Sequence, residues 1–179
     1  MIVVVGSVGL DNVETKIGKR TRTLGGACTY FSTAASLYDK VAMVAVVGKD
    51  FPNEHIDYLN ARGIDLRGLQ IAEGKTFFWA GRYSENMDEA LTLDTQLNVF
   101  ANFQPDIPQD LRSAEYLFLA NIDPSLQIHV MEQMTKPKVT ALDSMNFWIT
   151  STRETLTQAI SMVDIVFLNE TETRLYSGI

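Results

Sequence analysis

The stretch "IVVVG", at residues 2–6, is a continuous run of β-branched side chains that ends at a glycine. A strand that is apolar on both faces is typical of a parallel sheet covered by helices on both sides. Four more runs of this kind lie at residues 41–48, 116–120, 138–143 and 164–168. Because helical patterns separate these runs, the chain is predicted to be an α/β protein with a mostly parallel, helix-covered sheet.

The helical patterns occupy the gaps between the runs. In "GGACTYFSTAASLYD", at residues 25–39, a stripe with helical spacing comprises Ala27, Tyr30, Phe31, Ala34, Ala35 and Tyr38. Residues 50–63 predict a second helix, with Asp50 as its N-cap and Gly63 as its stop. Residues 125–134 and 151–160 supply two more.

One region has a different period. Between residues 91 and 99 apolar and polar side chains alternate, which predicts a half-buried strand whose apolar face comprises Leu91, Leu93, Leu97 and Val99. Together with residues 74–83 it is interpreted as a small β insertion. The expected organisation is therefore an α/β core of residues 1–66 and 104–179, with a β lid at 67–103. The apolar face of this insertion must cover a site, the main domain or a second copy of itself, as in a homodimer.

Composition limits the classes of ligand. The net charge of −7 and the pI near 4.8 argue against binding to nucleic acid, whose partners are usually basic. No apolar run approaches the roughly 20 residues of a membrane span. The single Cys28 excludes an internal disulfide and fits a reducing, cytoplasmic location. A small molecule or a protein partner is expected.

Polar residues follow each predicted strand, where open α/β sheets bind their ligands. They are Asp11, Asn121, Asp123, Asp143, Asn169 and Glu172. Oxygen acceptors gathered at one sheet edge suit hydroxyl-rich ligands and hydrated magnesium. We therefore assign Asn121 and Asp123 to a substrate and Asp143 to a cofactor. The alternative for each residue is helix capping, which favours the same residue types.

The adjacent Gly25 and Gly26 open a predicted helix. They would let a ligand approach the backbone and meet N–H groups at the positive end of the helix dipole. The alternative is a tight turn that needs positive φ. The sequence contains neither a Gly-x-Gly-x-x-Gly motif nor a P-loop motif. This argues against a Rossmann-type dinucleotide site and against a P-loop nucleotide site.

The order of the motifs is more specific than any one of them. Gly6-x4-Asp11, Gly25-Gly26 before a helix, "VGKD", a β insertion and "NETE" after an apolar strand succeed one another along the chain. This order resembles the amino-terminal part of the ribokinase-like (PfkB) carbohydrate kinase family. The resemblance extends over essentially the whole chain.

The resemblance implies ATP-dependent phosphotransfer to a hydroxymethyl group of a sugar or nucleoside, under a β lid. It implies that Asp11 binds substrate hydroxyls and that Gly25 and Gly26 line the substrate pocket. It also implies that Asn169 and Glu172 form an Asn-x-x-Glu motif that organises magnesium and phosphate, with Glu172 toward the metal.

Two features depart from the family pattern. Tyr30 stands where the family usually has asparagine, and a phenol can stack on a ring or donate one hydrogen bond. The Gly-Ala-Gly-Asp segment with the catalytic base is absent from the 179 residues. The base is therefore expected beyond Ile179, and these residues are expected to form an incomplete domain without turnover of their own. A non-catalytic α/β module that binds a sugar or polyol is the alternative function.

Overall fold

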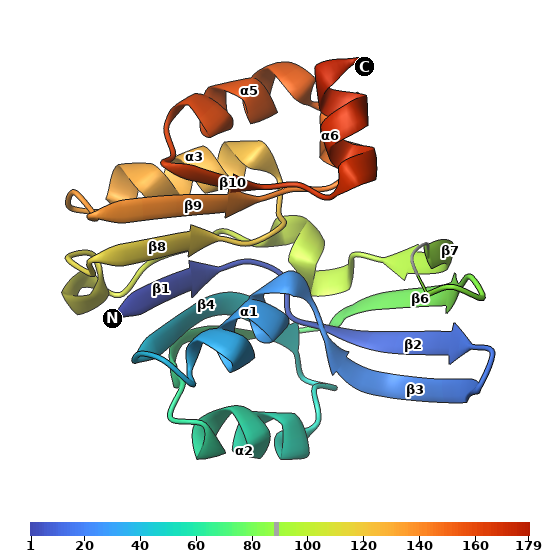
Figure 1. Ribbon diagram of the computed structural model, residues 1–179. Helices are drawn as coiled ribbons and strands as arrows, with labels where there is room; N and C mark the ends of the chain where they lie inside the picture. The colour runs from blue at the N-terminus through green and yellow to red at the C-terminus, as the bar shows by residue number, and fades with distance from the viewer. Residues whose placement is uncertain (88–89) are drawn as a thin grey trace.

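A large sheet of six parallel strands runs through the molecule (Figure 1). The computed structural model describes residues 1–87 and 90–179. The strand order is β10-β9-β8-β1-β4-β5, and the strands are β1 (Ile2–Val5), β4 (Val41–Gly48), β5 (Asp65–Ala72), β8 (Tyr116–Leu119), β9 (Val139–Asp143) and β10 (Ile165–Phe167). The five predicted apolar runs are confirmed as strands. The sixth, β5, was not predicted.

Helices cover both faces of this sheet. They are α1 (Ala27–Ala35), α2 (Asn53–Ala61), α3 (Pro124–Gln133), α4 (Asn146–Ser151), α5 (Arg153–Ser161) and α6 (Glu170–Ser177), with 3₁₀ turns at η1 (Asn98–Asn102) and η2 (Gln109–Leu111). Strand β4 explains the continuous apolar runs, because Val44 and Val46 enter the core beneath α3 and α5 while Met43 and Val47 enter the core beneath α1 and α2. Within residues 1–87 and 90–179, no helix combines the length and apolar character of a membrane span.

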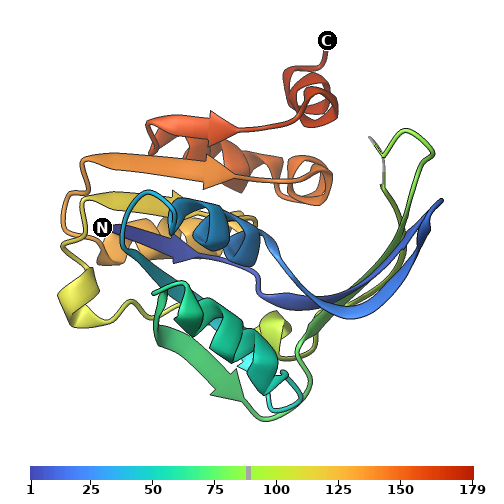
Figure 2. The same cartoon turned by 60° about the horizontal axis from the view of Figure 1, so that its bottom comes forward.

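A second, four-stranded sheet has the order β3-β2-β6-β7. Its strands are β2 (Gly9–Thr15), β3 (Gly18–Gly25), β6 (Phe77–Tyr83) and β7 (Ala90–Gln96). Figure 2 shows this small sheet curving away from the large one, beside the carboxyl ends of its strands. Its composition differs from the expected 67–103 insertion, since β5 joins the large sheet and the N-terminal hairpin β2–β3 joins the small one.

Asp50 ties the small sheet to the large one. Its carboxylate accepts hydrogen bonds from the backbone N–H of Thr76 (2.7 Å), from Thr76 Oγ1 (2.8 Å) and from Arg22 (3.4 Å). The prediction that Asp50 caps α2 was therefore wrong, because the helix begins later, with Pro52 at its N-cap. Gly63 follows the helix with a φ of +70°, as the predicted stop requires.

Helix α1 packs on the large sheet through its smallest residues. Its buried side chains are Cys28, Thr29, Ser32 and Ala35, which let the helix approach the strands closely. The expected stripe was therefore only partly right, since Tyr30 is 60% exposed and Tyr38, beyond the helix, is 89% exposed. Tyr30 is left available on the outside of the helix.

The outer strand of the small sheet is open to solvent. Every described residue of β7 is exposed, including Leu91 and Leu93. Leu97 is also exposed, whereas Val99 lies in η1 and packs against the core beneath α3. The predicted burial of this stripe therefore does not occur within the chain, apart from Val99.

Candidate active site

The carboxyl ends of the parallel strands lie at one edge of the large sheet, and the small sheet curves beside that edge (Figure 2). Two groups of polar side chains gather there. One surrounds Asp11 on β2, where the chain leaves β1 and enters the small sheet. The other follows β8, β9 and β10, and its members line one pocket.

The Asp11 side chain is packed against Gly25. Asp11 is only 8% exposed, and a Cβ atom at position 25 would overlap the carboxylate. Gly25 is therefore required because the carboxylate occupies the space that any side chain would need. This explains the first of the two adjacent glycines.

Gly26 has a different role. Its φ is +95°, and a Cβ atom there would overlap the carbonyl oxygen of Ser7. That carbonyl accepts from the N–H of Cys28 at 3.1 Å, and Ser7 Oγ accepts from the N–H of Ala27 at 3.1 Å. The tight-turn alternative therefore holds for Gly26, and two of the first N–H groups of α1 already have partners in the chain.

The Asp11 carboxylate has no hydrogen-bond or ion-pair partner among the described residues. Burial raises its pKa from 3.8 to about 6. Partial burial, followed by the nearby charges of Asp11 and Tyr83, raises the pKa of Tyr30. Asp11 is thus a nearly buried acceptor with unused hydrogen-bonding capacity.

The second group lines a pocket of about 550 Å³. Its polar members are Asn121, Asp143, Ser144, Asn169 and Glu172. Burial, and next the charge of Glu172, raises the pKa of Asp143 to about 6. Ser144 Oγ is buried without a hydrogen-bond partner among the described residues. The pocket therefore combines two carboxylates with an unused hydroxyl.

Asn169 and Glu172 form a capping box at the start of α6. The Asn169 Oδ1 atom accepts from the N–H of Glu172 (2.9 Å), and Glu172 Oε2 accepts from the N–H of Asn169 (2.8 Å). The capping role considered for this motif is therefore present, and both residues also line the pocket.

Asn121 and Asp123, expected to act together, lie in different surroundings. Asn121 Oδ1 accepts from Trp148 Nε1 at 2.9 Å and faces the pocket of Asp143. Asp123 caps α3 by accepting from the N–H (2.8 Å) and Oγ (2.7 Å) of Ser125, and it lines a separate pocket. For Asp123 the capping alternative is observed.

The donor set at the second pocket fits a magnesium ion. The described residues contain no cluster of three or more potential protein ligands. Magnesium, however, usually keeps several waters and binds one or two carboxylates together with substrate phosphates. Asp143 and Glu172 provide two carboxylates, and the Ser144 hydroxyl, which has no partner in the described part of the chain, lies in the same lining.

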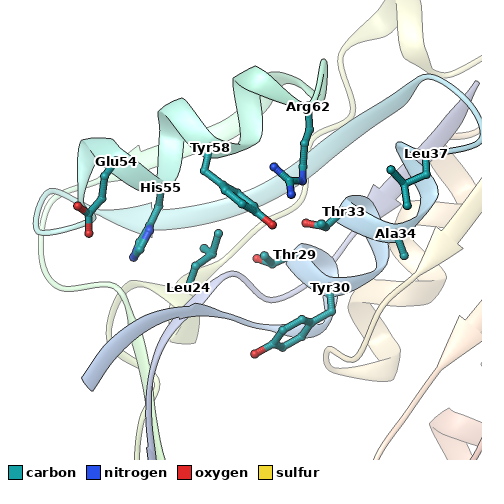
Figure 3. A pocket seen from close by; sticks show the side chains of 10 residues that line it. All are labelled: Leu24, Thr29, Tyr30, Thr33, Ala34, Leu37, Glu54, His55, Tyr58 and Arg62. Atoms are coloured by element: carbon teal, nitrogen blue, oxygen red, sulfur yellow. The ribbon is translucent and has the colours of Figure 1, made fainter. Parts of the chain in front are cut away.

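A larger groove, of about 580 Å³, lies between α1 and α2 (Figure 3). Leu24, Ala34, Leu37 and Tyr58 contribute to a mainly apolar lining. Tyr30 stands at its rim and points away from α2. Since the carboxylates lie at the strand ends instead, we place the candidate active site there.

Neither Ser7 nor Ser144 was predicted as a site residue. Ser7 and Ser144 each come directly after residues that were noted, Gly6 and Asp143. Their positions after strand ends were the available signal. The contact of Trp148 with Asn121 spans 27 residues and has no local signature.

Residues 1–179 match the family model described as pfkB family carbohydrate kinase. The chain belongs to this family. The predicted resemblance and the α/β, ribokinase-like fold are therefore confirmed. Family membership gives no support to the alternative of a non-catalytic binding module.

This pfkB family chain is similar to a cytidine kinase of Thermococcus kodakarensis, with 29% identity over 99% of the chain and 64% of the relative. It superposes on a Methanocaldococcus jannaschii nucleoside kinase with a TM-score of 0.77 at 17% identity, covering 99% and 63% of the two chains. An E. coli protein assigned as a ribokinase II, in complex with ATP and Mg²⁺, gives 0.76 at 15% identity, covering 98% and 64%. The chain thus spans slightly less than two thirds of these relatives.

The Asp11→Asn substitution tests the burial of this carboxylate. Because the folded-state pKa is raised, ionisation of Asp11 above pH 6 opposes folding, whereas below pH 4 both states are protonated. The variant should be more stable than the parent by about 1 to 2 kcal/mol at pH 8, with the gain shrinking toward pH 4.

Urea unfolding at pH 8 and at pH 4 measures the difference in stability between the variant and the parent. Asp123→Asn is the matched control, and it should leave stability nearly unchanged because asparagine and aspartate are equivalent N-caps. A gain for Asp11→Asn that is equal at both pH values, or a loss at pH 8, would contradict the burial argument.

Proposed function

We propose that the protein transfers a phosphoryl group from ATP to a hydroxymethyl group of a nucleoside or sugar. The observation that carries this proposal is the Asp11 carboxylate, which is nearly buried and has no partner within residues 1–87 and 90–179. It lies beside a sheet edge that also bears a two-carboxylate pocket. A carboxylate without a partner is costly to bury, so its retention fits a ligand that supplies the missing donors. Substrate hydroxyl groups are donors of this kind.

On the substrate side, Asp11 accepts hydrogen bonds from hydroxyl groups of the sugar ring. The carboxylate is the better acceptor when ionised, so binding should strengthen as the pH rises through the pKa of about 6. Gly25 leaves the space that the carboxylate itself occupies. Holding the substrate in one orientation contributes directly to phosphoryl transfer, which depends mainly on positioning and charge stabilisation.

On the cofactor side, Asp143 and Glu172 would hold magnesium through its water ligands. Bound magnesium neutralises charge that develops on the transferring phosphoryl group. Asn169 fixes the Glu172 backbone through the capping box, and Asn121 is oriented by Trp148. These contacts keep the polar groups in place before the nucleotide arrives.

The 179 residues contain no Gly-Ala-Gly-Asp segment, which supplies the catalytic base in the resemblance described above. We propose that these residues bind the substrates but do not turn them over on their own. The test of activity therefore uses the whole protein, with the 179-residue chain measured in parallel.

The decisive assay is ATP consumption by the whole protein with a panel of nucleosides and sugars in the presence of Mg²⁺. We expect a phosphorylated product for at least one substrate, and a decrease in kcat/KM of about tenfold or more for Asp11→Asn, which loses a charge-assisted hydrogen bond. Asp123→Asn serves again as the control and should retain activity. Binding of a sugar or nucleoside without any consumption of ATP would contradict the proposal.

We also propose that a second copy of the chain covers the open side of β7 as a homodimer. Leu91 and Leu93 on β7, and Leu97 directly after it, are exposed apolar side chains, at 63, 50 and 49%. An exposed edge strand with apolar side chains favours pairing with another chain. Pairing of the two small sheets would bury apolar side chains that the alternating sequence pattern predicts to be buried.

Sedimentation velocity tests the dimer. The parent protein should sediment as a dimer at micromolar concentration, and Leu91→Lys should shift it toward monomer. Leu37→Lys is the control, because Leu37 is 77% exposed but lies just after α1, away from the small sheet. A parent protein that is monomeric at all concentrations would exclude the dimer.

A further inference from the structure

Trp79 stands next to Asp11 on the same face of the small sheet. In the register of β2 and β6, Asp11 is the partner of Trp79, and side chains of paired residues in neighbouring strands point to the same side. Tyr83 lies four residues further along β6 and therefore shares this face. This face is the one that carries the substrate-binding carboxylate proposed above.

Local contacts hold the indole in place. Trp79 Nε1 donates to Thr92 Oγ1 on β7 at 3.2 Å. The six-membered ring lies over Gly81, where a Cβ atom would overlap it. The Tyr83 ring meets it edge-on, with ring centroids 6.5 Å apart. Both residues are only partly buried, so the indole leaves accessible aromatic surface beside Asp11 and Tyr83 extends that surface along β6.

Tyr30 adds a third ring from α1. Tyr30 lies in the first turn of the helix that follows Gly25 and Gly26, and it is 60% exposed. Gly25, which contacts the Asp11 carboxylate, lies five residues before Tyr30 at the start of this helix. Partial burial, followed by the charges of Asp11 and Tyr83, raises the pKa of the Tyr30 phenol. Trp79 thus lies beside Asp11, Tyr83 packs against Trp79, and Tyr30 lies on the helix that begins next to Asp11. We call Tyr30, Trp79 and Tyr83 the aromatic wall.

We propose that the aromatic wall contacts a planar ring attached to the sugar, so that the site selects nucleosides over free sugars. This inference rests on the proposed function and names its substrate class. Asp11 takes the hydroxyl groups of the sugar, and the wall lies where a group attached to that sugar would extend. A free pentose would leave the three rings in water.

The wall selects for the presence of a base more than for its identity. Stacking on aromatic side chains tolerates every base because each base has a π-face. The Tyr30 hydroxyl adds one donor and one acceptor, which is too little to define a full hydrogen-bonding pattern. We therefore expect related nucleosides to be accepted with similar efficiency.

The test compares kcat/KM of the whole protein for cytidine and for D-ribose. The parent should prefer cytidine by about tenfold or more, as expected for loss of a stacked base. Trp79→Leu, Tyr83→Leu and Tyr30→Asn should each lower kcat/KM for cytidine about fivefold or more, with that for D-ribose changed less than about twofold. Tyr38→Asn is the control, because Tyr38 is 89% exposed beyond the end of the same helix as Tyr30.

The outcomes separate the two proposals. A parent protein that phosphorylates neither nucleosides nor sugars refutes the proposed function. A parent that phosphorylates D-ribose as well as cytidine, or variants that lower both values equally or neither, refute the aromatic wall while the kinase remains. Using Tyr83→Leu and Tyr30→Asn beside Trp79→Leu keeps the test decisive if loss of the indole unfolds the lid.

Discussion

The contact between the Asp11 carboxylate and the bare backbone of Gly25 is the constraint on which the rest of the site depends. A carboxylate that is 8% exposed and has no partner among the described residues opposes folding once it is ionised. The chain nevertheless provides the glycine that makes room for it. Such an arrangement is typical of binding sites, where residues needed for function lower the stability of the fold.

The chain path from β1 into the small sheet brings this carboxylate to the carboxyl edge of the large sheet. The chain leaves β1 at the carboxyl edge of the large sheet and goes directly into the hairpin β2–β3, so Asp11 reaches the small sheet within six residues of Val5. Asp50 and Thr76 then join the two sheets through two short hydrogen bonds. The substrate side and the lid are therefore one structure, while the pocket of Asp143 and Glu172 belongs to the large sheet.

The sequence predicted the features that depend on local pattern. Strands β1, β4, β8 and β9 were found because burial on both faces requires an uninterrupted apolar run, as in β4. The edge strand β10 also has such a run, although its side chains are exposed or half-buried. Strands β2, β3 and β5 were missed because their burial is mixed, and β3 has five exposed residues in succession. Their pairing depends on partners far away in the chain, which no local period reports.

The same distinction between local pattern and distant contacts applies to the site residues. Asp11, Asp143, Asn169 and Glu172 were identified from their positions after strands, and the structure places them at the carboxyl edge. Whether an aspartate caps a helix or faces a pocket depended on tertiary contacts, as Asp50 and Asp123 demonstrate. The sequence also did not reveal that Tyr30 points outward. Small residues, and not the aromatic ones, form the buried face of α1.

The most direct test of this account is a ¹³C NMR titration of the Asp11 carboxyl group in the whole protein, assigned with Asp11→Asn. Without substrate, its pKa should be about 6. With saturating nucleoside, hydrogen bonds from hydroxyl groups should stabilise the ionised form and lower the pKa by about one unit or more. A pKa near 3.8 in the free protein, or one that does not respond to a saturating nucleoside, would contradict the claim that this carboxylate is kept without a partner for the substrate.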